Sequence, residues 1–63
     1  MTQKELLYLE DAIGHEKNII DICTESLNNM EDKNLISFLE KQLENHKQTK
    51  EELLNMLEVK SNG

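Results

Sequence analysis

The sequence lacks proline and tryptophan, and its only glycines are Gly14 and Gly63. Proline and glycine often end helices and form turns, so their scarcity predicts long, uninterrupted helices. Gly14 falls inside one of them, where it is either tolerated at the surface or lets a neighbouring helix approach closely. Cys23 is the only cysteine, which excludes a disulfide bond within the chain and fits a reducing compartment.

Long hydrophobic runs are also absent. Apolar residues occur in short groups such as Leu53-Leu54, so no segment is predicted to span a bilayer. The first residues contain no apolar stretch typical of a signal peptide, and we therefore expect synthesis and retention inside a cell. The net charge of −6 disfavours binding to nucleic acids and to anionic membranes, because both carry negative charge.

Capping signals divide the chain into two helices. The segment 2–5 (TQKE) matches a capping box, Asp32 is a good N-cap, and Asn28 and Asn29 can end a helix in a left-handed conformation. We therefore predict an all-α fold in which residues 1–63 form one hairpin. Its parts are a helix at about 3–28, a turn at about 29–32 and a helix at about 33–60.

An apolar heptad pattern runs along both predicted helices. Steps of three and four residues place these side chains on one face of each helix. We name this face the seam; it comprises Leu6, Leu9, Ile13, Glu16, Ile20, Cys23, Leu27 and Met30, and then Ile36, Leu39, Leu43, His46, Lys50, Leu53 and Leu57. Six of these residues are expected to be buried in the core: Leu9, Ile13, Ile20, Leu39, Leu43 and Leu53.

The short turn makes the two helices antiparallel. In a hairpin centred near Glu31, residue n lies at about the level of residue 62 − n, so Glu16 faces His46. Two helices of about 27 residues, or ~40 Å, cannot bury a continuous stripe against each other alone. The pattern therefore predicts a homodimer, which forms a ferritin-like or Rop-like four-helix bundle.

Glu16 and His46 are polar residues at the middle of the seam. Inward-facing carboxylate and imidazole groups hold iron, manganese or zinc in helical bundles, and a dimer would supply two of each. The ferritin-like Glu-x-x-His motif is broken, since Leu43 stands three residues before His46. Two interpretations follow: a hydrogen-bonded layer that fixes the register of the helices without a cofactor, or a zinc or iron site formed by Glu16 and His46.

Other candidate residues have simpler interpretations. Asp11 and His15 share one helix face, as a solvated surface pair or as weak metal ligands. Cys23 is expected to be a buried structural thiol, because no base lies level with it. Three large side chains outside the seam either widen the core or mark a partner surface: Tyr8, Ile22 and Phe38.

Two segments carry a resemblance to a known family. MTQKELLYLEDAIGHEK at the start and LISFLEKQLENHKQTKEELLNML in the second half resemble the coat F family of spore coat proteins, in particular its short, hairpin-sized members. Glu16-Lys17 matches the Glu-Lys of that family's first helix, and His46 matches its mid-helix histidine. The resemblance, over about residues 1–58, implies a ferritin-like bundle and a spore-associated structural role beside other coat proteins.

We therefore expect a non-enzymatic structural or interaction protein, made in the cytoplasm and associated with the spore coat, that acts as a homodimer. One alternative is a half-ferritin-like metal-binding bundle that uses Glu16 and His46. Another is a small two-helix signalling regulator similar to sporulation aspartyl-phosphate phosphatases, although the Ser-x-x-Leu-Asp signature of that family is missing at Ser37. The acidic charge disfavours an RNA-binding dimer of the Rop kind.

Overall fold

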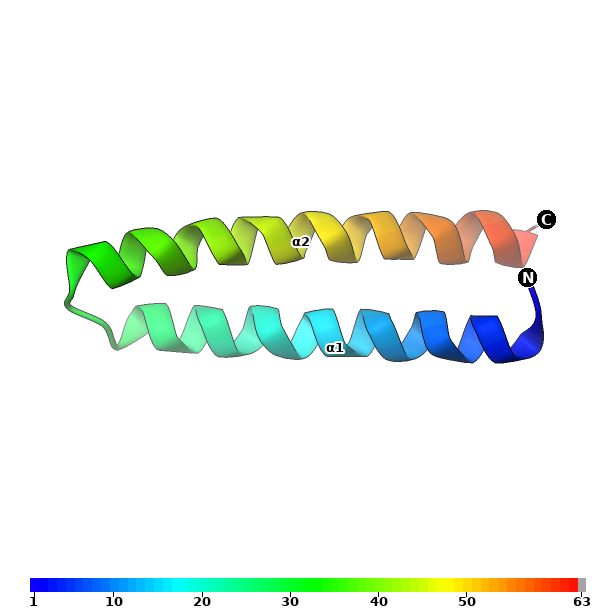
Figure 1. Ribbon diagram of the computed structural model, residues 1–63, viewed down its shortest axis with the longest axis horizontal. Helices are drawn as coiled ribbons and strands as arrows, with labels where there is room; N and C mark the ends of the chain where they lie inside the picture. Colours follow the sequence, from blue (N-terminus) through cyan, green and yellow to red (C-terminus); the bar gives the residue numbers. More distant parts are fainter. Residues whose placement is uncertain (63) are drawn as a thin grey trace.

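Two antiparallel α-helices make up the part of the chain that the structure describes (Figure 1). This computed structural model describes the backbone of residues 1–62 and the side chains of residues 1–59. Helix α1 spans Gln3–Asn28 and helix α2 spans Lys33–Asn62, so α2 continues past the expected end near Lys60. The chain reverses between them, and the rod-shaped hairpin measures 46 Å along its Cα atoms. The predicted all-α hairpin is confirmed; Gly63 lies outside the described residues.

Side-chain caps fix the N-termini of both helices. Thr2 Oγ1 accepts a hydrogen bond from the Glu5 N–H at 3.1 Å, and Glu5 Oε1 accepts one from the Thr2 N–H at 2.8 Å. Ahead of α2, Asp32 Oδ1 accepts hydrogen bonds from the N–H groups of Asn34 and Leu35 at 2.9 and 3.0 Å. Because these carboxylates and hydroxyls satisfy donors that a helix start leaves unpaired, both predicted caps are confirmed.

The C-terminus of α1 differs from the sequence prediction. Asn29 has φ −116° and ψ 6°, and none of the described residues has a positive φ outside glycine. Asn29 ends the helix with two hydrogen bonds instead of a left-handed conformation. Its side-chain Nδ2 donates to the Glu25 carbonyl at 3.0 Å, and its backbone N–H donates to the Ser26 carbonyl at 3.1 Å. Two carbonyls at the helix end are thereby satisfied without the left-handed residue that was predicted.

The seam lies between the two helices. Cys23, which is 8% exposed, is the only buried side chain among residues 1–59. Every other seam residue is half-buried, including the six that were expected to be buried. A single hairpin therefore brings its two apolar stripes together but leaves part of each stripe in contact with water.

Gly14 lies on α1 away from the seam. A Cβ atom built on it would meet no other atom within 4 Å. Within the hairpin, Gly14 is therefore a surface glycine in the middle of a helix rather than a point of close helix approach.

We predict that Gly14→Ala raises the free energy of unfolding by ~0.5–1 kcal/mol, because alanine loses less backbone entropy than glycine in a helix. Urea denaturation of both forms at equal protein concentration measures the change. A loss of stability would show that a neighbouring helix, supplied by another chain, approaches α1 at this point.

Candidate functional site

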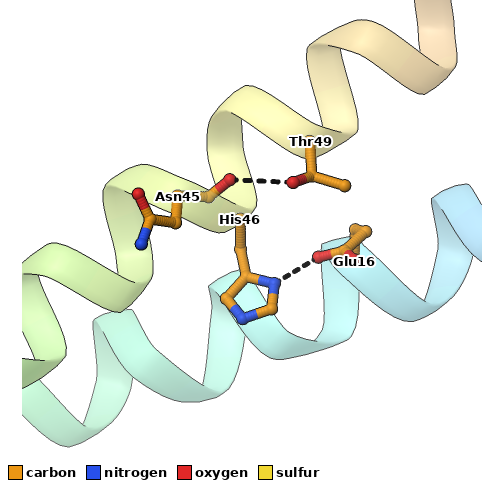
Figure 2. Close-up of polar contacts among 4 residues, drawn as sticks. All are labelled: Glu16, Asn45, His46 and Thr49. Carbon is orange, nitrogen blue, oxygen red and sulfur yellow. Dashed lines mark hydrogen bonds and ion pairs between the residues drawn. The ribbon is translucent and has the colours of Figure 1, made fainter.

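Glu16 and His46 meet near the middle of the hairpin, one from each helix (Figure 2). His46 Nδ1 lies 2.5 Å from Glu16 Oε2, and the ring N–H donates a hydrogen bond to the carboxylate. The two residues are 30 positions apart in the sequence, and the antiparallel turn brings them level. The hydrogen bond of the first interpretation is therefore present, and it forms within one chain.

The pair is only partly shielded from water. The Glu16 side chain is 15% exposed and that of His46 is 29% exposed. Along the seam, Ile13 and Ile20 flank Glu16, and Leu43 and Lys50 flank His46. The layer toward the turn is therefore apolar, and the layer toward the chain ends contains a half-buried lysine. A hydrogen bond to a charged group in such surroundings is stronger than in water, and losing one partner leaves the other half-buried and unpaired.

Neighbouring polar groups do not join the pair. Thr49 Oγ1 donates a hydrogen bond to the Asn45 carbonyl of its own helix at 3.0 Å, as Figure 2 shows. Thr24 Oγ1 likewise donates to the Ile20 carbonyl on α1 at 2.8 Å. Among the described side chains, Glu16 and His46 therefore have each other as their side-chain partner and no third group.

Within one chain, the structure brings together two side chains of the kind that a zinc or iron site uses. Glu16 Oε2 and His46 Nδ1 form a hydrogen bond with each other. A carboxylate bound to one ring nitrogen can orient a histidine whose other nitrogen ligates a metal, but here that would supply a single ligand. Structural zinc needs four ligands, and residues 1–59 contain no group of three or more His, Cys, Asp or Glu side chains placed to share an ion.

The other candidate residues lie apart from this pair. Asp11 and His15 are both exposed on α1, and Cys23 is a free, buried thiol. The three large side chains outside the seam do not widen the core of a single hairpin, since Tyr8, Ile22 and Phe38 are 60%, 63% and 57% exposed. These three side chains remain candidates for a surface that contacts a partner.

Four half-buried residues outside the seam were missed from the sequence: Ala12, Ile19, Ser26 and Gln42. Each directly precedes a seam residue, and the first three recur every seven positions along α1. These residues could therefore have been recognised in the sequence, because they share a third heptad position that holds small, apolar or amide side chains. The packed face of the hairpin is wider on this flank than a strict two-position seam.

Comparison with known proteins identifies no relative: no family model, no curated protein and no solved structure matches the chain. Neither helix, as far as the chain is described, has the length and apolarity needed to cross a membrane.

We predict that Glu16→Ala lowers the free energy of unfolding by ~1–3 kcal/mol, because it leaves His46 half-buried without its acceptor. The double variant Glu16→Leu with His46→Leu should recover the wild-type stability or exceed it, since two apolar residues replace both polar partners. Chemical denaturation measures both effects. Glu10→Ala, which removes an exposed carboxylate from the same helix, is the matched control. An equal response at positions 10 and 16 would contradict a stabilising layer.

Addition of metal to the wild type and to His46→Ala separates the structural interpretation from the metal interpretation. A metal that binds only the folded form raises stability by ~2.7 kcal/mol at a hundredfold excess over its dissociation constant. We expect no such rise when zinc or ferrous iron is added to the wild-type protein. Stabilisation of the wild type by sub-micromolar metal, absent in His46→Ala, would instead identify a metal centre.

Proposed function

We propose that this chain is a non-enzymatic structural or interaction protein that acts as a homodimer, with two hairpins packed into one four-helix bundle. The half-buried seam is the observation that carries the proposal. In this chain of 63 residues without a disulfide bond, Cys23 is the only buried side chain among residues 1–59, and it is still 8% exposed. A second hairpin would bring two more apolar stripes to the same core and cover what the first leaves in water.

The exposed apolar surface supports the same proposal. Large apolar side chains remain more than half exposed along both helices, among them Ile22, Phe38 and Val59 at 63%, 57% and 67%. Monomeric proteins rarely leave such side chains grouped along their whole length, because burying apolar area stabilises by ~25 cal/mol per Å². Association is therefore the simplest way for this hairpin to reach the stability of an ordinary domain.

The place of the bundle in the cell rests on the resemblance to short coat F proteins. We infer a protein made in the cytoplasm and assembled into the spore coat beside other coat proteins. A bundle that encloses most of these apolar groups and keeps its carboxylates outside would suit a role carried by surface contacts rather than by a reaction. The metal-binding alternative would use the same two residues, Glu16 and His46, whose side chains hydrogen-bond to each other.

Sedimentation equilibrium tests the dimer. We expect twice the chain mass of 7.4 kDa down to micromolar protein, and a thermal midpoint that rises with protein concentration. A folded chain of single mass with a concentration-independent, cooperative transition would refute the bundle. In spores of a host that produces a tagged form of the chain, the protein should fractionate with the coat extract rather than with the core.

A further inference from the structure

The two helices divide the surface of the hairpin into two unlike sides. With Leu6 and Ile36 at heptad position a, positions g and c of both helices lie on one side of the seam, and positions e and b lie on the other. The first side holds every seventh residue counted from Glu5 and Tyr8 in α1 and from Leu35 and Phe38 in α2. We name it the uncharged side and its opposite the charged side.

The two sides differ in how many charged residues they carry. The charged side carries six acidic residues and three lysines, from Glu10 near the start of α1 to Glu58 in α2. On the uncharged side, Glu5 and Glu52 are the only aspartate, glutamate or lysine residues in the two helices. Glu5 caps its own helix at Thr2, and Glu52 accepts a hydrogen bond from Gln48 at 3.5 Å. His15 is the one remaining side chain on this side that can be cationic. The other residues can meet another surface without desolvating an ionised side chain.

Apolar exposure follows the same division. Six of the eight large apolar side chains exposed on the helices lie on the uncharged side, and they are 51–67% exposed: Tyr8, Ile22, Leu35, Phe38, Met56 and Val59. The four half-buried residues outside the seam, such as Ile19 and Gln42, lie there too. The core of the hairpin therefore already extends toward this side, and a partner packed on it would continue the core.

The uncharged side is complementary to itself. One apolar cluster, near the turn, contains Ile22, Leu35 and Phe38, and the other, near the chain ends, contains Tyr8, Met56 and Val59. Along the helix axes, each cluster lies roughly 12–15 Å from the level of Glu16 and His46. Small or uncharged side chains such as Ala12 and Thr49 separate them. A two-fold axis at the middle level therefore places apolar clusters on apolar clusters, as an isologous interface requires.

The size and the charge of this surface also fit a second copy. The hairpin measures 46 by 14 Å between Cα atoms. Side chains extend beyond the Cα atoms, so the area of that face approaches the ~800 Å² per partner that a standard specific interface buries. Two chains that each carry a net charge of −6 repel one another unless their ionised groups point apart. Contact through the uncharged sides keeps the charged sides in water on opposite faces of the assembly.

We propose that a second copy of the chain packs on the uncharged side, and that the charged side stays exposed in the dimer. This inference rests on the proposed homodimeric function and assigns the surface that the function uses. Tyr8, Ile22 and Phe38 are then interface residues, and Leu7 and Leu54 remain at the surface. The two Glu16–His46 layers come to the same level of one bundle, where the second copy completes their partial shielding from water.

A matched set of lysine substitutions tests the assignment. Tyr8 and Leu7 are neighbours in α1 with 60% and 55% exposure, and they lie on opposite sides. Phe38 is 57% exposed and belongs to the other apolar cluster, near the turn. Tyr8→Lys, Phe38→Lys and Leu7→Lys change the net charge equally, so repulsion between whole chains is altered to the same extent in each. Sedimentation and the concentration dependence of the thermal midpoint give the dissociation constant even if an isolated hairpin unfolds.

We expect Tyr8→Lys and Phe38→Lys to raise the dimer dissociation constant by about tenfold or more, because symmetry places each new charge twice in the interface. Leu7→Lys should leave it within about threefold of the wild type. A dimeric wild type in which Leu7→Lys weakens association as much as Tyr8→Lys and Phe38→Lys would overturn the assigned surface while leaving the homodimer intact. A wild type that is monomeric at all concentrations would overturn both.

Discussion

The limited burial that two helices can provide for each other governs this structure. A helix shows an apolar stripe to its partner, but a pair of cylinders in contact shields only the part of each stripe that faces the other. In this hairpin the consequence is visible at almost every seam position. Side chains such as Leu9, Leu39 and Leu43 are half-buried, and Cys23 alone among the seam residues is buried. The cap hydrogen bonds and the central polar pair order the helices, but they do not supply the missing apolar contact.

Most of the hairpin follows from local chemistry that can be read in the sequence. The capping box at Thr2 and the aspartate cap at Asp32 involve contacts across two or three residues, and both form as the residue types indicate. The level of Glu16 with His46 follows from counting outward from a short turn, because each helix advances by the same rise per residue. These features were predictable because each depends on few groups and on regular geometry.

Other features depended on which of two alternative interactions forms, and the residue pattern does not show that. At Asn29, a left-handed backbone and a side-chain amide bound to the Glu25 carbonyl are alternative ways to satisfy a helix end, and the residue type permits both. The flank containing Ala12, Ile19 and Gln42 was missed because a strict alternation of three and four residues treats both flanks of the seam as equal. Which flank is covered depends on how the helices rotate about their axes, and that rotation is set by packing.

The Glu16–His46 layer matters more for the register of the helices than for the strength of their packing. Slipping one helix by a heptad would keep the seam together but place Glu16 level with Leu39 or Leu53, and His46 level with Leu9 or Cys23. Aliphatic layers tolerate such exchanges, whereas each stranded polar group would cost ~1–3 kcal/mol. Within one chain, the Asp32 cap and the Asn29 helix end already define the turn, so register is specified twice. In the proposed dimer no turn connects the two hairpins, and a polar layer at the middle level would then be the feature that distinguishes one alignment of apolar stripes from its neighbours. A pair of leucines would hold the bundle at least as strongly but would remove that distinction.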